Sequence, residues 1–164
     1  MADPRIKPFA AAAAVFALDR ISKWFIGAHV SFEDTYKVIP GFFDIVHSEN
    51  RGIAFGFFDG AASELRTALL AAFSLAAIAV MGAFLWKGRG SLARLSQFGF
   101  ALVMGGAAGN VFDRIVWGRV TDFLLFYIGE HQWPAFNVAD SAISVGAGLV
   151  LLDLLRTKQA AHVS

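Results

Sequence analysis

The chain has 164 residues, of which 57% are hydrophobic and only 16% are charged, and its mean hydropathy is +0.58. Soluble globular domains contain about 45 to 50% apolar and about 25% charged residues, so this composition excludes an ordinary soluble domain and indicates a membrane protein. The net charge of +1 without a basic tract argues against nucleic acid as a partner, and the lack of cysteine excludes disulfides and thiolate metal sites.

Four segments are long and apolar enough to cross about 30 Å of hydrocarbon. They are residues 8–28, 64–86, 95–115 and 138–155. The first segment could instead be a cleaved signal peptide, because basic residues precede its apolar run. A retained helix fits better, since Asp19 and Arg20 stand where a cleavage site needs small residues. We therefore predict an α-helical integral membrane protein with four transmembrane helices in one domain, residues 1–164.

Lys and Arg residues are distributed unevenly over the connections between these segments. Seven lie at the two chain ends and between the second and third segments, and three lie in the other two connections. Because cytoplasmic loops carry the excess of Lys and Arg, both termini are predicted to lie in the cytoplasm.

The first outer connection, residues 29–63, is too long for a bare link between helices. A turn at 38–41 leads into an extended run at 42–47, and a second extended run covers 52–58. We predict a small amphipathic β element here. The second outer connection, residues 116–137, is rich in aromatic residues that suit the membrane interface.

Ionisable residues inside the predicted helices are informative, because each costs about 2.5 to 3.5 kcal/mol unless it is paired or hydrated. Asp19 and Lys23 stand four residues apart on the first helix, share a face and are predicted to form an internal ion pair that anchors the helix end. A catalytic role for Lys23 is the lesser alternative.

The third predicted helix combines a packing motif with a polar face. Gly105 and Gly109 have the small-x-x-x-small spacing that lets another helix approach closely. Asn110, Asp113 and Arg114 follow at positions i, i+3 and i+4, near the outer membrane boundary. There Asp113 and Arg114 could offset each other's charge, although a solvated helix end would also explain the pattern.

Asp122 and Asp140 are both embedded in apolar sequence. Asp140 could be an ordinary acidic residue in a first helical turn capped by Asn137, but Asp122 has no such explanation. If the third and fourth helices are antiparallel neighbours, both carboxylates reach the same depth on the outer face. Two close, partly desolvated carboxylates share one proton, which suits amide hydrolysis: the ionised member activates a water and the protonated member polarises the carbonyl.

Two other functions fit this sequence less well. A proton or ion relay through Asp19, Asp113, Asp122 and Asp140 is disfavoured because all four are predicted in the outer half of the membrane. A Ser-Lys protease is disfavoured because Lys23 is the only lysine inside a predicted span and no nucleophile motif adjoins it. No metal motif is visible, and the four histidines are scattered: His29, His47, His131 and His162.

Four blocks of the sequence resemble, in order, the motifs of the lipoprotein signal peptidase (signal peptidase II) family, which are aspartic endopeptidases of bacterial cytoplasmic membranes. The blocks are Asp-Arg-Ile-Ser-Lys at 19–23, Asn-Arg-Gly-Ile-Ala-Phe at 50–55, the glycine-rich run 105–114 with its continuation 118–123, and Phe-Asn-Val-Ala-Asp at 136–140. The resemblance spans nearly the whole chain. Its departures are mild, with Ser22, Ile53 and Thr121 standing where the family often has Thr, Ala and Val.

The resemblance implies a role for each matching residue. Asp122 and Asp140 would be the catalytic dyad, Asn110 and Asn137 its hydrogen-bonding neighbours, Asn50 and Arg114 contacts to the substrate backbone, and Asp19, Lys23, Gly52 and Asp113 supports of the site and of the outer β element, or cradle.

The resemblance also implies the substrate and the place of action. The substrate would be a prolipoprotein that carries a diacylglycerol on the Cys after the cleavage site, and the enzyme would need neither cofactor nor metal. Globomycin, a cyclic peptide antibiotic, would inhibit it. The implied location is the bacterial cytoplasmic (inner) membrane, among its lipids, with the active site of this peptidase domain near the outer face.

Overall fold

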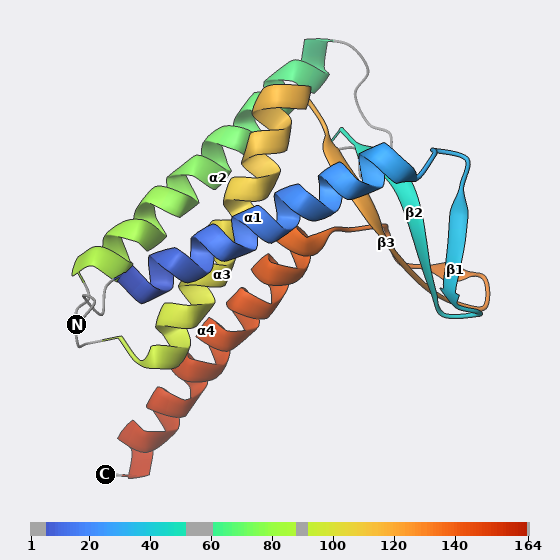
Figure 1. The fold of residues 1–164 in the computed structure, drawn as a ribbon. Coiled ribbons are helices and arrows are strands. Elements are labelled where there is room, and N and C mark those ends of the chain that lie inside the picture. Colours follow the sequence, from blue (N-terminus) through green and yellow to red (C-terminus); the bar gives the residue numbers. More distant parts are fainter. Residues whose placement is uncertain (1–5, 52–60, 88–91, 164) are drawn as a thin grey trace.

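The computed structural model describes residues 6–51, 61–87 and 92–163. Its elements in chain order are α1 (Ile6–His29), β1 (Thr35–Ile39), β2 (Phe43–Asn50), α2 (Ala61–Lys87), α3 (Arg94–Trp117), β3 (Val120–Ile128), β4 (His131–Gln132) and α4 (Val138–Val163). The helices form an elongated bundle, and the strands project from one end of it as a sheet (Figure 1).

Helix α3 is the centre of the bundle and packs against α1, α2 and α4. In its apolar stretch 56% of the residues are buried, against 11% in α2 and 17% in α4. Glycines make this packing possible, as the sequence predicts for Gly105 and Gly109. A Cβ on Gly105 would collide with the backbone oxygen of Ala12, and one on Gly109 with the carboxylate of Asp19. Both contacts bring α3 and α1 together.

Three stretches of the described chain are long and apolar enough to cross a membrane: Thr67–Lys87, Arg94–Trp117 and Val138–Lys158. The 24-residue helix α1 is long enough, but it contains charged residues. Its Asp19 and Lys23 are buried, while apolar residues such as Ile21 and Trp24 lie on its surface. The prediction that α1 is a fourth span therefore depends on this outward apolar face.

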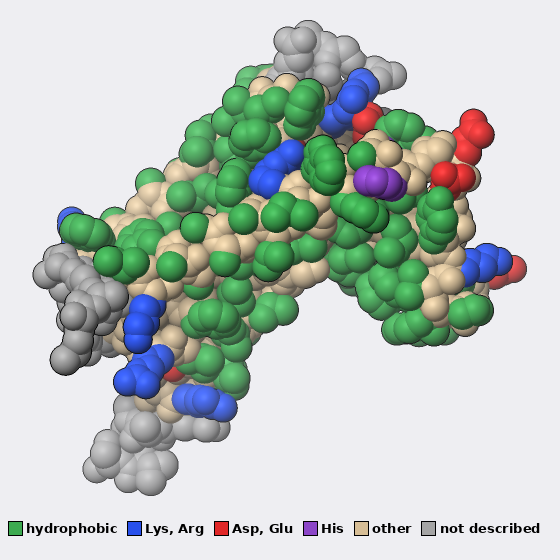
Figure 2. Space-filling view, in the orientation of Figure 1, with side chains coloured by type: hydrophobic (Ala, Val, Ile, Leu, Met, Phe, Trp, Pro, Cys, Tyr) green, Lys and Arg blue, Asp and Glu red, His purple; other side chains and the backbone are tan. Residues whose placement is uncertain are grey.

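The two ends of the bundle differ in charge. The first turn of α1 and the last turn of α4 lie at the same end, opposite the sheet (Figure 1). At this end the visible charged side chains are mainly Lys and Arg, whereas most visible Asp and Glu side chains lie toward the sheet (Figure 2). This asymmetry is the feature on which the predicted orientation depends.

The sheet is antiparallel, with strand order β1-β2-β3-β4. The extended run predicted at 42–47 is confirmed as β2, and the one predicted at 52–58 lies outside the described residues. The expectation that 116–137 is only an aromatic interface segment was incomplete, because β3 forms there and pairs with β2. Phe123 of β3 packs on Ile26 of α1 and on Val30, the residue after this helix, and so fastens the sheet to the bundle.

Candidate active site

The turn between α3 and β3 brings the first of the two predicted catalytic carboxylates to the end of the bundle. Gly118 ends α3 with a left-handed φ of 68° and donates its backbone N–H to Arg114 O at 3.1 Å. A left-handed residue at this position is the usual helix terminator, and glycine adopts it without a steric penalty. The chain then enters β3, where Asp122 lies opposite Ser48 of β2.

The second carboxylate begins α4 and is tied to the first through Asn137. The side-chain oxygen of Asn137 accepts the backbone N–H of Asp140 at 3.0 Å, which confirms Asn137 as the cap of α4. Its side-chain nitrogen donates to Asp122 Oδ1 at 2.7 Å and to the backbone oxygen of Thr121 at 3.2 Å. One buried amide therefore holds both carboxylates in place.

Two further amides complete the hydrogen bonds of the pair. Asn110 donates to Asp140 Oδ1 at 2.7 Å, and its own oxygen accepts from Lys23 at 3.0 Å and from Asn137 at 3.3 Å. Asn50 donates to Asp122 Oδ2 at 3.1 Å. Asp140 Oδ2 accepts the backbone N–H of Asn137 at 3.2 Å. All four carboxylate oxygens thus have a donor, and the third and fourth helices are neighbours as expected.

Burial controls the acidity of Asp122, which is 3% exposed. Loss of hydration raises its pKa from 3.8 to about 6, because a carboxylate in a low-dielectric environment is less stable than a neutral carboxyl. The hydrogen bonds from Asn50 and Asn137 lower this pKa, and the negative charge of Asp140 raises it. The guanidinium of Arg114 is within electrostatic reach of both carboxylates and donates to Asn110 O at 3.3 Å.

A cluster of buried charges lies directly behind these amides. The ammonium group of Lys23 is 2.9 Å from Asp19 Oδ2 and 2.8 Å from Asp113 Oδ2, in addition to its bond to Asn110. The predicted Asp19–Lys23 pair is confirmed. Asp19 Oδ1 also accepts the backbone N–H of Ala139, the residue before Asp140. The cluster therefore supports α4 at the position of the second carboxylate.

The negative charge of Asp113 acts on the Arg114 guanidinium, as the predicted charge offset requires, but the ion pairs of Asp113 are with other residues. Asp113 pairs with Lys23 and with Arg20, whose guanidinium also lies over the ring of Phe112 at 4.5 Å. Neighbouring residues on a helix point about 100° apart, so Arg114 is directed away from the α1 side of α3. Arg20 stands beside Asp19 in the sequence, but its ion pair with Asp113 on α3 does not follow from that position.

A cavity of about 290 Å³ opens at Asp122. It is lined by Ser48, Glu49, Asn50, Arg51, Asp122, Pro134 and Ala135. Within the described parts of the chain, no three His, Asp or Glu side chains converge as metal ligands. The predicted site residue Gly52 lies outside the described residues. The arrangement provides two hydrogen-bonded carboxylates beside a small cavity, at the end of the helices where the sheet begins.

Comparison with known families gives one decisive match. The pattern of the family described as signal peptidase (SPase) II covers residues 11–156. The chain belongs to the signal peptidase II family. It is accordingly a membrane protease of lipoprotein processing, and its apolar helices make it a multi-pass membrane protein.

Individual relatives agree with the family. The chain is 55% identical to the lipoprotein signal peptidase of Solibacter usitatus over 165 residues, with 100% of both chains covered. It is 38% identical to the lipoprotein signal peptidase of Syntrophus aciditrophicus, with 97% of this chain and 98% of the relative covered. A solved bacterial membrane enzyme superposes with a TM-score of 0.79 at 26% identity and covers 93% of this chain and 89% of that one.

Proposed function

We propose that this chain is an aspartic endopeptidase that removes the signal peptide from diacylglyceryl-modified prolipoproteins and cuts just before the lipidated Cys. The observation that carries the proposal is the joint anchoring of Asp122 and Asp140 by Asn137 beside a cavity. Family membership supports the substrate class, and the geometry supports the chemistry.

The two carboxyl groups act as general base and general acid. Asp140 is the ionised member and takes a proton from a water that attacks the scissile carbonyl. Asp122, whose pKa is raised to about 6, is the protonated member, and it polarises the carbonyl oxygen and then helps to protonate the leaving amine. No covalent intermediate is needed. Substrate binding removes further water from Asp122 and so favours its protonated form.

The surrounding residues position the reacting groups. Asn110 and Asn137 orient the two carboxylates, while Asn50 and Arg114 bind the backbone of the substrate around the scissile bond. Lys23, Asp19 and Asp113 support the site from behind, and Gly52 completes this supporting set. Residues that hold the water, the carboxylates and the scissile bond in a near-attack geometry lower the activation barrier of cleavage.

The membrane setting explains why a lipidated substrate is suitable. In the proposed orientation, one domain of residues 1–164 crosses the cytoplasmic (inner) membrane four times with both termini in the cytoplasm, and the sheet lies at the outer face as a cradle. A substrate held in the surrounding membrane lipids by its signal helix and two acyl chains reaches the carboxylates without a search through solution. A globomycin-like cyclic peptide would occupy the same substrate position.

Cleavage by purified protein in detergent tests the proposal. The substrate is a diacylglyceryl-modified prolipoprotein, and the unmodified precursor is the control. We expect Asp122→Asn and Asp140→Asn each to lose at least about 10³-fold in rate, in the range of general acid-base contributions. Asp44 on β2 is also buried and accepts a hydrogen bond from Tyr127 at 3.2 Å, so Asp44→Asn is the matched control and should retain activity.

Two outcomes would contradict the proposal. If either dyad variant cleaves near the wild-type rate, that carboxylate is structural. If the unmodified precursor is cut as fast as the lipidated one, the substrate class is wrong. Thermal unfolding of each variant separates loss of chemistry from loss of folding.

A further inference from the structure

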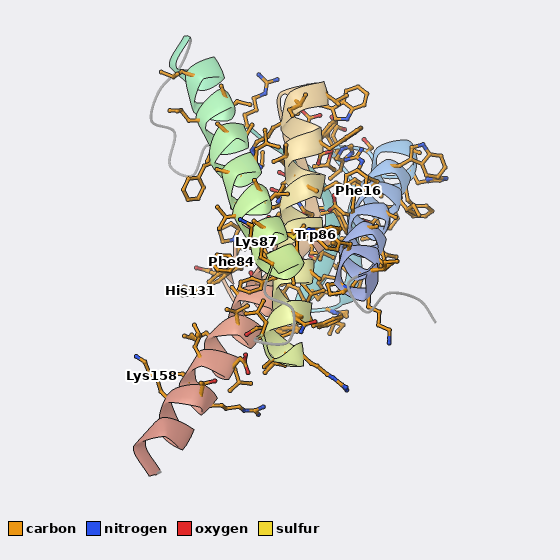
Figure 3. All side chains as sticks on the ribbon, turned by 90° about the vertical axis from the view of Figure 1, so that its left-hand side faces the viewer. Phe16, Phe84, Trp86, Lys87, His131 and Lys158 are labelled. Carbon is orange, nitrogen blue, oxygen red and sulfur yellow. The ribbon has the colours of Figure 1, made fainter. Side chains whose placement is uncertain are left out.

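Ser48 of β2 lies directly opposite Asp122 of β3 in the sheet. These strands stand behind the helical bundle in the view of Figure 3, and β3 packs on α1 and α3. Directly opposed residues of an antiparallel pair extend their side chains on the same face, with Cβ atoms about 4.5 to 5.5 Å apart. The hydroxyl of Ser48 is therefore a close neighbour of the Asp122 carboxyl group.

A β-bulge in β2 places a serine at this position. Ile45 pairs with Leu124 and Ser48 pairs with Asp122, so β2 has one residue more than β3 over this stretch. In a regular ladder, His47 would lie opposite Asp122. His47 instead lines a different cavity, of about 470 Å³, which does not include Asp122. The bulge thus exchanges an imidazole for a hydroxyl beside the carboxyl group, and bulges next to active sites commonly redirect side chains in this way.

The neighbours of Ser48 along β2 confirm which face carries its side chain. Asn50, two residues later and so on the same face, donates to Asp122 Oδ2 at 3.1 Å. Glu49, between them, pairs with Arg119 at 2.9 Å, and both line the cavity on the other face. Because side chains alternate along a strand, Ser48 and Asn50 both face the carboxyl group.

The hydroxyl of Ser48 is open to a ligand. The residue is half-buried and lines the cavity of about 290 Å³ at Asp122. Within the described parts of the chain its hydroxyl makes no hydrogen bond, whereas the amide of Asn50 donates to Asp122. No histidine or lysine is among the described residues that line this cavity, so Ser48 lacks the neighbouring base that a serine nucleophile needs. Its chemistry is that of a neutral hydrogen-bond donor.

Such a donor is useful where the scissile carbonyl oxygen becomes negative. Oxygens of this kind are stabilised by fixed donors about 2.7 to 3.1 Å away. A separation of about 5 Å between the Cβ atoms of Ser48 and Asp122 leaves room for one oxygen between the two side chains. In the proposed mechanism, the protonated carboxyl of Asp122 supplies one donor to this oxygen, and Ser48 can supply another.

We propose that Ser48 contacts the substrate and donates a second hydrogen bond to the scissile carbonyl oxygen, beside the bond from Asp122. The inference rests on the proposed peptidase function and adds a residue to its site. The bond strengthens as the oxygen becomes negative in the transition state, so it acts on kcat more than on KM.

Cleavage of a diacylglyceryl-modified prolipoprotein by the purified full-length protein in detergent tests the proposal. We expect Ser48→Ala to lower kcat about 10- to 100-fold, with KM and the unfolding temperature nearly unchanged. Thr keeps the hydroxyl and Val has the same shape without it, so Ser48→Thr should be more active than Ser48→Val. Thr35 is exposed on β1 outside the cavity, and Thr35→Val is the control that should cleave like the wild type.

Three results would overturn the role of Ser48. Ser48→Ala could keep the wild-type kcat, its defect could lie in KM alone, or Ser48→Thr could be no more active than Ser48→Val. Failure of the peptidase mechanism itself gives a different result in the same assay. A wild type that does not cleave, or an active Asp122→Asn variant, would overturn that mechanism and this inference with it.

Discussion

Asn137 and Asp140 cap each other at the start of α4. The backbone N–H of Asp140 donates to the side-chain oxygen of Asn137 at 3.0 Å, and the backbone N–H of Asn137 donates to Asp140 Oδ2 at 3.2 Å. This arrangement is a reciprocal capping box, and it leaves the side-chain nitrogen of Asn137 available to donate to Asp122. The start of a helix therefore sets the positions of two carboxylates that come from different elements.

The two roles of Asn137 can be separated by substitution. Asn137→Ser keeps an oxygen for the cap, but its hydroxyl is too short to reach Asp122 while it caps the helix. We expect cleavage to fall about 2- to 10-fold, the effect of about 0.5 to 1.5 kcal/mol for one hydrogen bond to the neutral carboxyl of Asp122. Asn137→Ala loses the cap as well and should be about 1 kcal/mol less stable than the Ser variant.

Cleavage rates and thermal unfolding in detergent check this prediction. The Ser and Ala variants should differ in unfolding temperature but share most of the loss in rate. A Ser variant with full activity would mean that the bond from Asn137 to Asp122 is not needed for the chemistry.

The raised pKa of Asp122 predicts the pH dependence of cleavage. In the proposed mechanism Asp122 must be protonated, and it is protonated below its pKa of about 6 and ionised above it. The value of kcat/KM should therefore fall as the pH rises through about 6. The hydrogen bond from Asn50 stabilises the ionised form, so Asn50→Ala should move this limb of the profile to higher pH.

A pH–rate profile of kcat/KM reports the free enzyme and is the appropriate measurement. Asp44→Asn, the buried control on β2, should leave the profile unchanged. A rate that rises through pH 6 and stays constant above it would assign Asp122 as the base rather than the acid.

Lys23 should matter first for folding. Its ammonium group contacts two buried carboxylates, those of Asp19 and Asp113, and removal of one partner from a buried ionic group costs about 3 to 5 kcal/mol. We expect Lys23→Met to unfold at a much lower temperature, and the double variant with Asp113→Asn to recover part of the loss. Thermal unfolding in detergent measures both.

A different result would change the role of Lys23. If Lys23→Met unfolds like the wild type but no longer cleaves substrate, the ammonium group takes part in the chemistry instead of supporting the site.

Local and periodic features of this fold could be predicted from the sequence. The apolar stretches gave the helices to within a few residues, apart from the longer C-terminal end of α4, because their length is set by the thickness of the bilayer. The Asp19–Lys23 pair follows from helical periodicity, and Asn137 as a cap follows from its place before an apolar run. Each of these features depends on a few consecutive residues.

Features that depend on contacts between distant segments could not be predicted in this way. Strand β3 looked like an aromatic interface segment, because its pairing with β2 joins residues at least 70 positions apart. The Arg20–Asp113 contact depends on how α1 meets α3, which the residues of either helix do not specify alone. The bond from Asn50 to Asp122 required both the sheet register and the turn at Gly118.

The close approach of α3 and α4 gives a final prediction, on Gly106. A Cβ at this position would collide with the backbone oxygen of Ala139 and lie 2.9 Å from Ile143 Cγ1. Gly106→Ala should therefore push α4 away from α3 and lower the free energy of unfolding by about 1 to 3 kcal/mol. It should also reduce cleavage by up to about 10²-fold, because Asp140 follows Ala139 and a shift near 1 Å misplaces it.

Gly148 on α4 provides the matched control, since a Cβ there would meet nothing within 4 Å. Gly148→Ala should cleave normally and be as stable as the wild type or more stable, because alanine is the better helix former by about 1 kcal/mol. Unfolding temperature and cleavage rate are measured for both variants. If Gly106→Ala behaves like Gly148→Ala, the contact between α3 and Ala139 is not what fixes Asp140, and the capping by Asn137 must do so alone.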